Sequence, residues 1–485
     1  MQHIFKSLLF VGLVLFSTGC TKDFDEINTN PNAPTAVSSG LLLPQIQRDM
    51  MGTVLGEAWG IGNIVIQQTA KNQFVNEDRY LWGEINGIWN AVYDNMRDVN
   101  NIIIQSETKG ENNYKGIALV MRAWMFSLAT DAYGDIPYSE AIRAKEGINY
   151  TKYDSQEEIY AGILRDLKDA SELLGTSGEV VAGDLIYKGD VSKWKKLANS
   201  LRVRYLVRIS GKKDVKADLQ AVAGGLLMEG NDDNGVYTYL AAAPDQFPNF
   251  TNRIGSFNEF RASKKMLDTL VSLGDTRLPI FFRPTPATEG TANPVYAGLP
   301  NGLNDVDALQ YNGGPQNQSR IGAIYYESAV TAQGLSIAKG VVMTYAELQF
   351  LLAEAAEKGL ISGTPAKTYY ENGVNASFAF YGLSTPTDYF YNPEVEFVGS
   401  TQDKLNKIGF QKWVSLFYQG MEAWFDWRRT RIPNITPGPS NQNNNMVPVR
   451  FYYPTIEQSL NAEGYKGAIQ RQGPDDLNTK MWYLK

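Results

Sequence analysis

The chain has 485 residues, with 45 Lys and Arg against 52 Asp and Glu and a formal net charge of −7. It contains no basic block or stripe, so its charge argues against nucleic acid or an anionic membrane surface as a partner. One Cys, Cys20, is present, which excludes a disulfide bond within the chain.

The first twenty residues have the order of an export signal. An apolar run, Leu8–Phe16, follows a short basic start, and small residues lead to Gly19 and Cys20. A Cys directly after a small residue resembles the lipobox of bacterial lipoproteins, in which cleavage precedes the Cys and its sulfur carries a diacylglycerol. We predict a signal peptide over residues 1–19 and lipidation of Cys20. The alternative is an ordinary secretory signal with a chance Cys.

Residues 20–40 are expected to form a lipidated tether, and residues 41–485 a single globular domain. Thr21–Glu26 resembles the charged tag that routes some bacterial lipoproteins to the outer cell surface, and Asn28–Pro34 has little helix or strand preference. A membrane-spanning helix needs about 20 apolar residues. Because charged residues interrupt the most apolar stretch after the signal, Val341–Leu360, we predict no membrane span.

Helical periodicity dominates the first half of the chain. Apolar residues recur at spacings of three and four between Trp82 and Gln105, which predicts an amphipathic helix. Tyr114–Tyr133 is apolar almost all round and should form a buried helix that ends at Gly134.

The same unit of two helices recurs along the chain. Further helices are predicted at Ser155–Leu174, Val191–Ile209, Val341–Lys358 and Pro365–Tyr381, and within Gly409–Arg429. Asp154 or Ser155 can cap the first of these. Repeated helix pairs of this length predict a mostly α fold on a tetratricopeptide-like helix-pair scaffold, although the strict repeat signature is absent.

Two stretches between the helix pairs, Asn231–Asn258 and Arg283–Gly340, are rich in Gly, Pro, Asn and Tyr. They predict long loops with short strands, so we expect a central loop insertion at about 231–340. Long ordered loops on a rigid scaffold usually carry binding residues. The alternative is that these loops only cover the helices.

The part of the chain that follows the predicted signal peptide contains no histidine. The single His, His3, lies in the predicted signal peptide, and Cys20 would carry the lipid. The mature chain would then lack Ser-His-Asp and Cys-His catalysis and zinc sites of the usual His and Cys type. The sequence also contains no G-x-S-x-G motif, no P-loop and no complete G-x-G-x-x-G motif. An enzyme would have to use a carboxylate pair, as glycosidases do, or a metal with oxygen ligands.

Two groups of carboxylates are candidates for such chemistry. Glu422 and Asp426 lie four residues apart on one helix face, and a second group around a helix end comprises Asp131, Asp135 and Glu140. The basic residues close to the first pair are Arg428, Arg429 and Arg431. They favour a structural network of salt bridges, so we predict no catalytic residue, no metal site and no cofactor. The sequence leaves a structural calcium ion open.

Aromatic residues are abundant, with 9 Trp, 27 Tyr and 21 Phe. Flat rings can stack on the apolar faces of sugars while Asn, Asp and Arg side chains hydrogen-bond the hydroxyl groups, so aromatic loops suit glycan capture. Most rings must still belong to the core. On helical stripes we assign to packing Trp89, Trp124, Trp194 and Trp413.

Several motifs together resemble the SusD/RagB family. They are the Cys20 leader, Arg122–Trp124 with Ala132–Tyr138, Tyr187–Asp190 with Lys193–Asn199, Gln411–Arg429, and Arg450–Asn461. Members of that family are surface lipoproteins of Bacteroidetes that bind glycans and sometimes peptides. They have a tetratricopeptide-like lobe and a loop-rich ligand lobe, and they cover a TonB-dependent outer-membrane barrel of the SusC type.

The resemblance implies a nutrient-binding lipoprotein without catalytic activity. Its expected location is the outer membrane, facing the cell exterior, and its expected partner is a SusC-like TonB-dependent transporter that receives the captured glycan. A peptide ligand is the alternative within the same family, and a carboxylate-dependent glycosidase is the more distant one.

The family motifs are architectural and transfer no ligand contact to a numbered position. The candidate ligand-binding residues therefore come from the aromatic and polar content of the loops. They are Arg79, Tyr80 and Trp82 before the first predicted helix, and Tyr311, Asn312, Arg320, Tyr325 and Tyr326 in the central insertion. Packing, or contact with the transporter, is the alternative role for each of them.

Overall fold

The structure is a computed structural model that describes residues 37–143, 146–148, 150–251, 259–325 and 335–485. The chain divides into two units, Met1–Ser38 and Ser39–Lys485, and the fold described below is that of the second unit. The predicted signal peptide and Cys20 lie outside the described residues.

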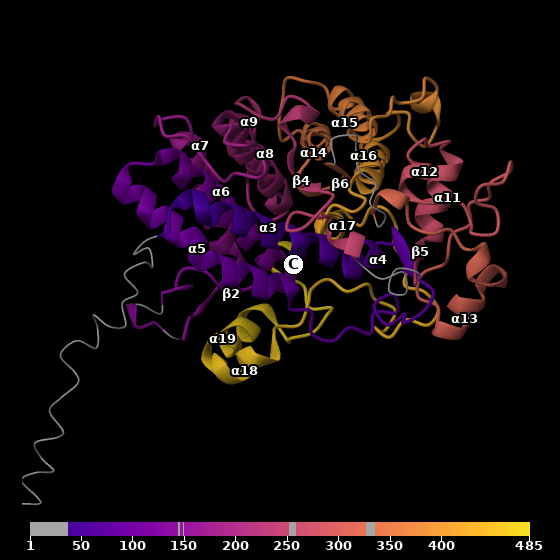
Figure 1. Cartoon of the computed structure of the whole chain (residues 1–485), viewed down its shortest axis with the longest axis horizontal. Coiled ribbons are helices and arrows are strands. Elements are labelled where there is room, and N and C mark those ends of the chain that lie inside the picture. Colours follow the sequence, from indigo (N-terminus) through magenta and orange to yellow (C-terminus); the bar gives the residue numbers. More distant parts are fainter. Residues whose placement is uncertain (1–36, 144–145, 149, 252–258, 326–334) are drawn as a thin grey trace, which may run out of the picture. The chain divides into compact units, whose positions relative to one another are not determined.

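Helices that follow one another in sequence pack side by side and form a scaffold (Figure 1). The first series consists of α3 (Ser39–Glu57), α5 (Gly87–Lys109), α6 (Asn112–Tyr133), α7 (Gln156–Leu173) and α8 (Val191–Ile209). The second series consists of α14 (Tyr345–Glu357), α15 (Ala366–Phe380) and α16 (Thr401–Ser415), and α14 packs against α8. The fold is therefore mostly α and is built from helix pairs, as the periodicity predicts.

Shorter elements complete the unit. The helices are α4 (Asn63–Val65), α9 (Lys216–Ala223), α11 (Lys264–Ser272), α12 (Leu278–Phe281), α13 (Asp305–Gln310), α17 (Glu422–Thr430), α18 (Thr455–Leu460) and α19 (Ala462–Gln472). The antiparallel strand pairs are β1 (Thr69–Lys71) with β5 (Phe260–Ala262), β2 (Ile136–Pro137) with β3 (Tyr153–Asp154), and β4 (Gly235–Leu240) with β6 (Leu335–Met343). The β1–β5 pair joins the N-terminal helices to the loop-rich region that contains α11, α12 and α13.

Local signals determine several helix ends as the sequence predicts. Ser155 caps α7 by accepting a hydrogen bond from the backbone N–H of Glu158, whose side chain accepts from Ser155 in return. Asp190, a cap that was not predicted, accepts from the backbone N–H groups of Ser192 and Lys193 at the start of α8. Helix α6 ends at Gly134, which has a φ of 93° that a side chain would disfavour.

Three helix boundaries differ from the prediction. Helix α5 begins at Gly87 instead of Trp82, because the indole of Trp82 turns back and donates to the carbonyl of Glu77. Helix α14 begins at Tyr345, since the residues before it extend β6 and pair with β4. The helix predicted within Gly409–Arg429 is two helices, α16 and α17, because Tyr418 and Gly420 between them are left-handed.

The core confirms the assignment of the helical tryptophans to packing. The side chains of Trp89, Trp124, Trp194 and Trp413 are all buried. They belong to one large hydrophobic cluster that runs through both helix series.

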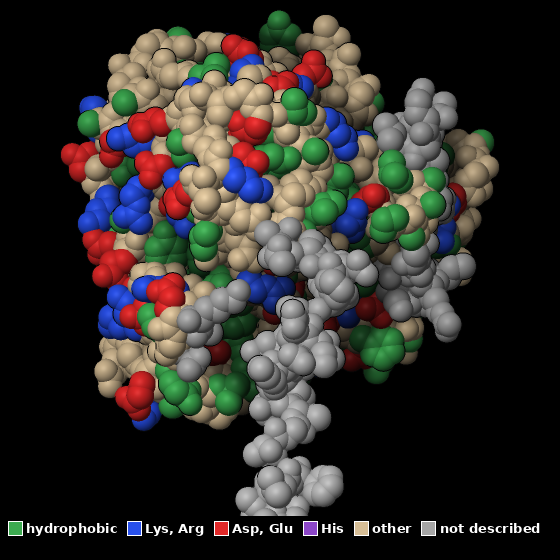
Figure 2. All heavy atoms as spheres, turned by 60° about the vertical axis from the view of Figure 1, so that its left-hand side comes forward, with side chains coloured by type: hydrophobic (Ala, Val, Ile, Leu, Met, Phe, Trp, Pro, Cys, Tyr) green, Lys and Arg blue, Asp and Glu red, His purple; other side chains and the backbone are tan. Residues whose placement is uncertain are grey.

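The surface of the first helix series carries mixed charge. Figure 2 shows basic and acidic side chains interspersed on this face instead of one sign gathered in a stripe. Examples are the ion pairs of Arg122 with Asp166 and of Lys115 with Glu107. This face therefore offers no electrostatic track for a nucleic acid.

Candidate functional site

The buried carboxyl group of Asp78 connects two loops that are far apart in sequence. Asn301 donates from its side-chain amide to Asp78 Oδ1 at 2.7 Å and to the carbonyl of Thr69 at 2.8 Å. The backbone N–H of Lys71 donates to the other carboxylate oxygen at 3.2 Å. Burial raises the pKa of Asp78 to about 7, although these hydrogen bonds and that of Gly302 act to lower it.

A third loop closes on the first two. Nε of Arg79 donates to the carbonyl of Ser440 at 2.8 Å, and the backbone N–H of Gln442 donates to the carbonyl of Arg79 at 2.7 Å. Gly302 has a φ of 71°, and a Cβ atom there would lie 2.8 Å from the Cα of Gly438. Glycine at both of these positions therefore allows the backbones of the two loops to come into contact.

A fourth segment, 311–318, is connected to the first loop by Asn72, which donates to the side-chain oxygen of Gln318 at 3.0 Å. Gln318 in turn donates to the carbonyl of Tyr311 at 3.0 Å. We call the four connected segments, 72–82, 299–307, 311–318 and 438–446, the loop junction. It lies near α13 and β5 in Figure 1.

The loop junction exposes apolar side chains beside polar ones. Phe74 is 70% exposed and Val306 is 61% exposed, and they flank the hydrogen bond from the Val75 N–H to Asp305. Leu81 and Met446 are also exposed. An aromatic ring on a framework held by buried hydrogen bonds is suited to stack on a flat, partly apolar ligand whose hydroxyl groups bind nearby polar side chains.

The first three predicted ligand residues lie in the loop junction, but two of them face its interior. Tyr80 is 2% exposed and Trp82 is 8% exposed. Trp82 packs edge-on against Trp424 and Tyr80. Arg79 is half-buried and holds the backbone of Ser440. In this structure the three side chains support the site from within, and their contact with a ligand stays a prediction.

Some candidate ligand-binding residues of the central insertion lie inside the loop junction and others lie outside it. Tyr311 is half-buried and Asn312 is exposed, and both belong to the loop junction. Arg320 lies outside the junction segments and pairs with Glu289 at 2.5 Å. Ligand contact by these three residues also stays a prediction.

Tyr325 lies apart from the loop junction. Its ring is buried and stacks on Tyr418 with centroids 4.3 Å apart. Tyr326 falls outside the described residues, as does the lipidation site Cys20.

Phe74 and Val306 were not among the predicted residues. Phe74 follows polar residues in an irregular segment, and its composition does not distinguish it from Tyr80, which is buried six positions later. Only the packing of the loops separates the exposed ring from the buried one.

The carboxylates that could have served catalysis have structural partners. Glu422 pairs with Arg208, which also pairs with Asp131. Asp426 pairs with Lys412 and Arg429, each at 2.9 Å. A salt-bridge network is therefore present, but of the three arginines that the sequence offers as partners only Arg429 takes part in it among the described residues. The other partners are Arg208 on α8 and Lys412 on α16.

The remaining two carboxylates of the second group also have separate partners. Asp135 accepts from Nε of Arg471 at 2.9 Å and from the backbone N–H of Gln156. Glu140 accepts from the backbone N–H of Lys152 at 3.0 Å. They do not form a cluster around a shared ligand.

Within the described part of the chain, no group of three or more His, Cys, Asp or Glu side chains could hold a metal ion. The helices of the same residues include none with the length and apolar character that crossing a membrane would require.

Comparison with known proteins identifies the family. The sequence profile of the SusD-like family, described as starch-binding and associating with the outer membrane, matches residues 31–454. Among curated proteins, no sequence matches the chain.

Solved structures share the fold along nearly the whole chain. One SusD homologue from Bacteroides fragilis is 28% identical with a TM-score of 0.81, and covers 93% of this chain and 99% of its own. A second SusD homologue from the same species is 26% identical with a TM-score of 0.82, and covers 93% of this chain and 100% of its own. A chitin-binding protein is 28% identical with a TM-score of 0.80, and covers 92% of this chain and 100% of its own. The family resemblance of the sequence motifs is confirmed, and the chain belongs to the SusD-like family of outer-membrane-associated binding proteins.

Proposed function

We propose that this chain is a surface lipoprotein that captures an oligosaccharide or polysaccharide at the loop junction and delivers it to a SusC-like TonB-dependent transporter. In this proposal residues 1–19 are removed, the sulfur of Cys20 carries the lipid, residues 20–40 form the tether and residues 41–485 form the binding domain. The protein itself catalyses no reaction.

The exposed ring of Phe74 is the observation that carries the glycan proposal. Phe74 is exposed together with Leu81, Val306 and Met446 on a framework of buried hydrogen bonds, and a group of exposed apolar side chains favours a role in contact with a ligand. The starch-binding description of the family and the chitin-binding relative support a sugar as that ligand. A sugar ring offers the apolar face that Phe74 can cover.

Calorimetric titration of a broad panel separates glycan from peptide. The full chain, purified in detergent, should bind at least one neutral oligosaccharide, such as a maltohexaose or a chitohexaose, and should not bind a matched panel of peptides. Binding of peptides without any oligosaccharide would replace the glycan by the peptide alternative.

Product analysis on the same panel tests the absence of catalysis. We expect no shortened oligosaccharide after prolonged incubation, because Glu422 and Asp426 on α17 and Asp131 on α6 are engaged by basic side chains. Release of shorter products that Glu422→Gln abolishes would support the glycosidase alternative.

The anchor has a test of its own. A Cys20→Ala chain should still bind the oligosaccharide in solution but should fail to support its uptake by cells, since the lipid would hold the protein beside its transporter. Normal uptake by that variant would contradict this role of Cys20.

A further inference from the structure

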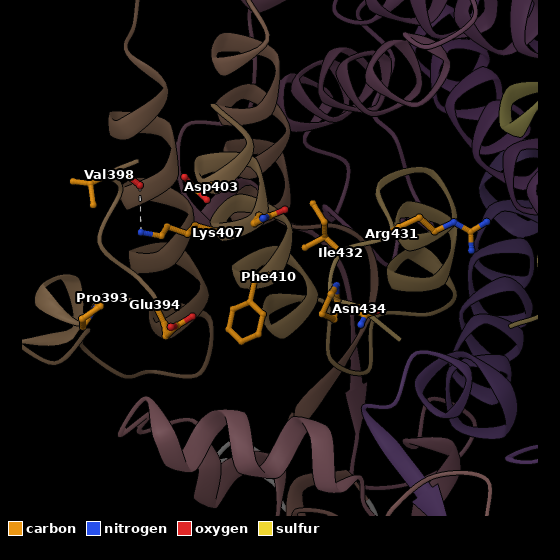
Figure 3. Close-up of a pocket in the computed structure, with 11 residues that line it drawn as sticks. Pro393, Glu394, Val398, Asp403, Lys407, Phe410, Arg431, Ile432 and Asn434 are labelled. Carbon is orange, nitrogen blue, oxygen red and sulfur yellow. Dashed lines mark hydrogen bonds between the residues drawn. The ribbon is translucent and has the colours of Figure 1, made fainter. Parts of the chain in front are cut away.

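Two cavities, which we call the groove, lie beside the turn that follows α17. On one side a cavity of about 630 Å³ lies between this turn and α16, and its lining includes Phe410 and Lys407 (Figure 3). On the other side a cavity of about 520 Å³ lies between the turn and residues 445–449, 478 and 480. Arg431 and Asn434 line both cavities, so the two lie on either side of the same turn.

The charged side chains that line the second cavity are all basic. Arg431 and Lys480 are its charged lining residues, and no carboxylate is among the described residues that line it. Across the described residues neither of these two cations makes an ion pair. Two positive charges thus line one cavity without an acidic partner among the residues that the structure describes.

The guanidinium of Arg431 is held in place before any ligand arrives. Its central carbon lies 4.4 Å from the ring centre of Trp427, and the Trp427 indole is fixed by donating to the carbonyl of Pro433 at 2.9 Å. In Figure 3 the side chain of Arg431 points away from Phe410. Desolvation of the guanidinium, with Arg428 nearby, lowers the pKa of Arg431, while the side chain as a whole stays exposed and can meet an anion.

Amide side chains complete the lining. Asn434, Asn445 and Asn478 border the cavity. Asn478 exchanges hydrogen bonds with Asn443 and Asn445 accepts from Asn441, whereas Asn434 is exposed without a side-chain partner among the described residues. Amides donate to and accept from hydroxyl groups, which an inorganic anion lacks but a sugar supplies. Asn445 and Met446 belong to the segment 438–446 of the loop junction, so the cavity borders the proposed glycan site.

We propose that the cavity beside Arg431 and Lys480 is a subsite for an acidic sugar unit, whose carboxylate or sulfate group binds the two cations while its hydroxyls meet the surrounding amides. This inference rests on the proposed glycan-binding function and names the glycan as an anionic one. The planar fork of an arginine suits the two oxygens of either group.

Calorimetric titration of the full chain in detergent tests the subsite with defined probes. Hexagalacturonate supplies carboxylates, an oligomeric dextran sulfate supplies sulfates, and maltohexaose is neutral. At low salt, at least one anionic probe should bind about ten times more tightly than maltohexaose, a difference of about 1.4 kcal/mol. Its affinity should fall as salt rises, because the interaction is ionic.

Variants locate the effect. Arg431→Gln and Lys480→Gln should each remove most of the preference for the anionic probe and leave the affinity for maltohexaose unchanged. Arg97→Gln is the matched control, since Arg97 is an exposed arginine on α5 far from the groove in sequence, and it should leave the preference intact. Lys480 is exposed, so its substitution should leave folding undisturbed even if Arg431→Gln reduces stability.

The outcomes separate this inference from the proposed function. Binding of maltohexaose without preference for either anionic probe would overturn the acidic subsite alone. A preference that Arg431→Gln and Lys480→Gln leave unchanged would also overturn it. Binding of hexaglutamate that depends on Arg431, without binding of either anionic sugar, would assign the cavity to acidic peptides. Failure to bind any sugar would overturn the proposed function itself.

Discussion

The side-chain amide of Asn301 donates to the buried carboxyl group of Asp78 at 2.7 Å, across 223 positions of sequence. The same amide also reaches the carbonyl of Thr69, so a single side chain connects the segment after β1 to the loop before α13. The exposed ring of Phe74 lies on the first of these loops. The stability of the loop junction therefore determines how that ring is presented.

Substitution of Asn301 should weaken the loop junction. In Asn301→Ala the carbonyl of Thr69 and Oδ1 of Asp78 lose a donor in a buried setting, and we expect a loss of about 1–3 kcal/mol in the free energy of unfolding. Chemical denaturation followed by fluorescence measures the change. Asn312→Ala, in an exposed part of the same junction, serves as the control and should be near neutral.

The carboxyl group of Asp78 should make stability depend on pH. Its folded pKa of about 7 exceeds the ordinary 3.8, so the folded chain holds the proton more tightly than the unfolded chain. The free energy of unfolding should therefore fall as pH rises from about 4 to about 7, by up to about 4 kcal/mol. Denaturation at pH 4.5 and pH 7.5 measures this slope.

Asp78→Asn should reduce that slope, since the substituted side chain no longer titrates. Some slope of the same sign should persist from Glu57, whose pKa burial also raises to about 7, and Glu57→Gln should reduce this remainder. An unchanged slope in Asp78→Asn would show that Asp78 is ionised at low pH in the folded chain.

The close approach of two loops should not tolerate a side chain at Gly302. The added methyl group of Gly302→Ala would meet the backbone of Gly438, and the left-handed φ adds strain. We expect lower thermal stability together with weaker oligosaccharide binding. Gly83→Ala is the matched control, because Gly83 has open space around it. Equal behaviour of the two variants would contradict the tight contact.

The buried ionic network should be intolerant of a missing charge. Although burial alone would raise the pKa of Glu354, Arg429 and Lys412 hold it well below its usual range. Glu354→Gln leaves the two buried cations with the single carboxylate of Asp426 as their counter-charge and should cost about 3–5 kcal/mol in the free energy of unfolding. Glu172→Gln removes a partner of an exposed surface pair at 3.9 Å and should change stability by about 1 kcal/mol at most.

The sequence predicts the parts of the fold that local chemistry determines. Helices α7 and α8 begin where Ser155 and Asp190 can cap them, and their apolar spacing carries through to the observed ends. Strand β6 was predicted partly as helix, because a short apolar run with Val341 and Val342 fits either structure until its pairing with β4 is known.

The residues of the candidate site are harder to predict from the sequence than the helices are, for a physical reason. Its segments meet through hydrogen bonds between residues that lie hundreds of positions apart, such as Arg79 with Ser440. Composition points to the segment before α5, but it does not distinguish the buried rings of Tyr80 and Trp82 from the exposed ring of Phe74.

Glycan capture at the loop junction is tested most directly by titrating the oligosaccharide that binds best into Phe74→Ala and the unsubstituted chain. Loss of an exposed stacking ring should leave folding intact and weaken binding by about 2 kcal/mol, or about 30-fold. Tyr150→Ala, which removes an equally exposed ring outside the junction, should bind normally. Unchanged affinity in Phe74→Ala, or an equal loss in both variants, would contradict the assignment of the site.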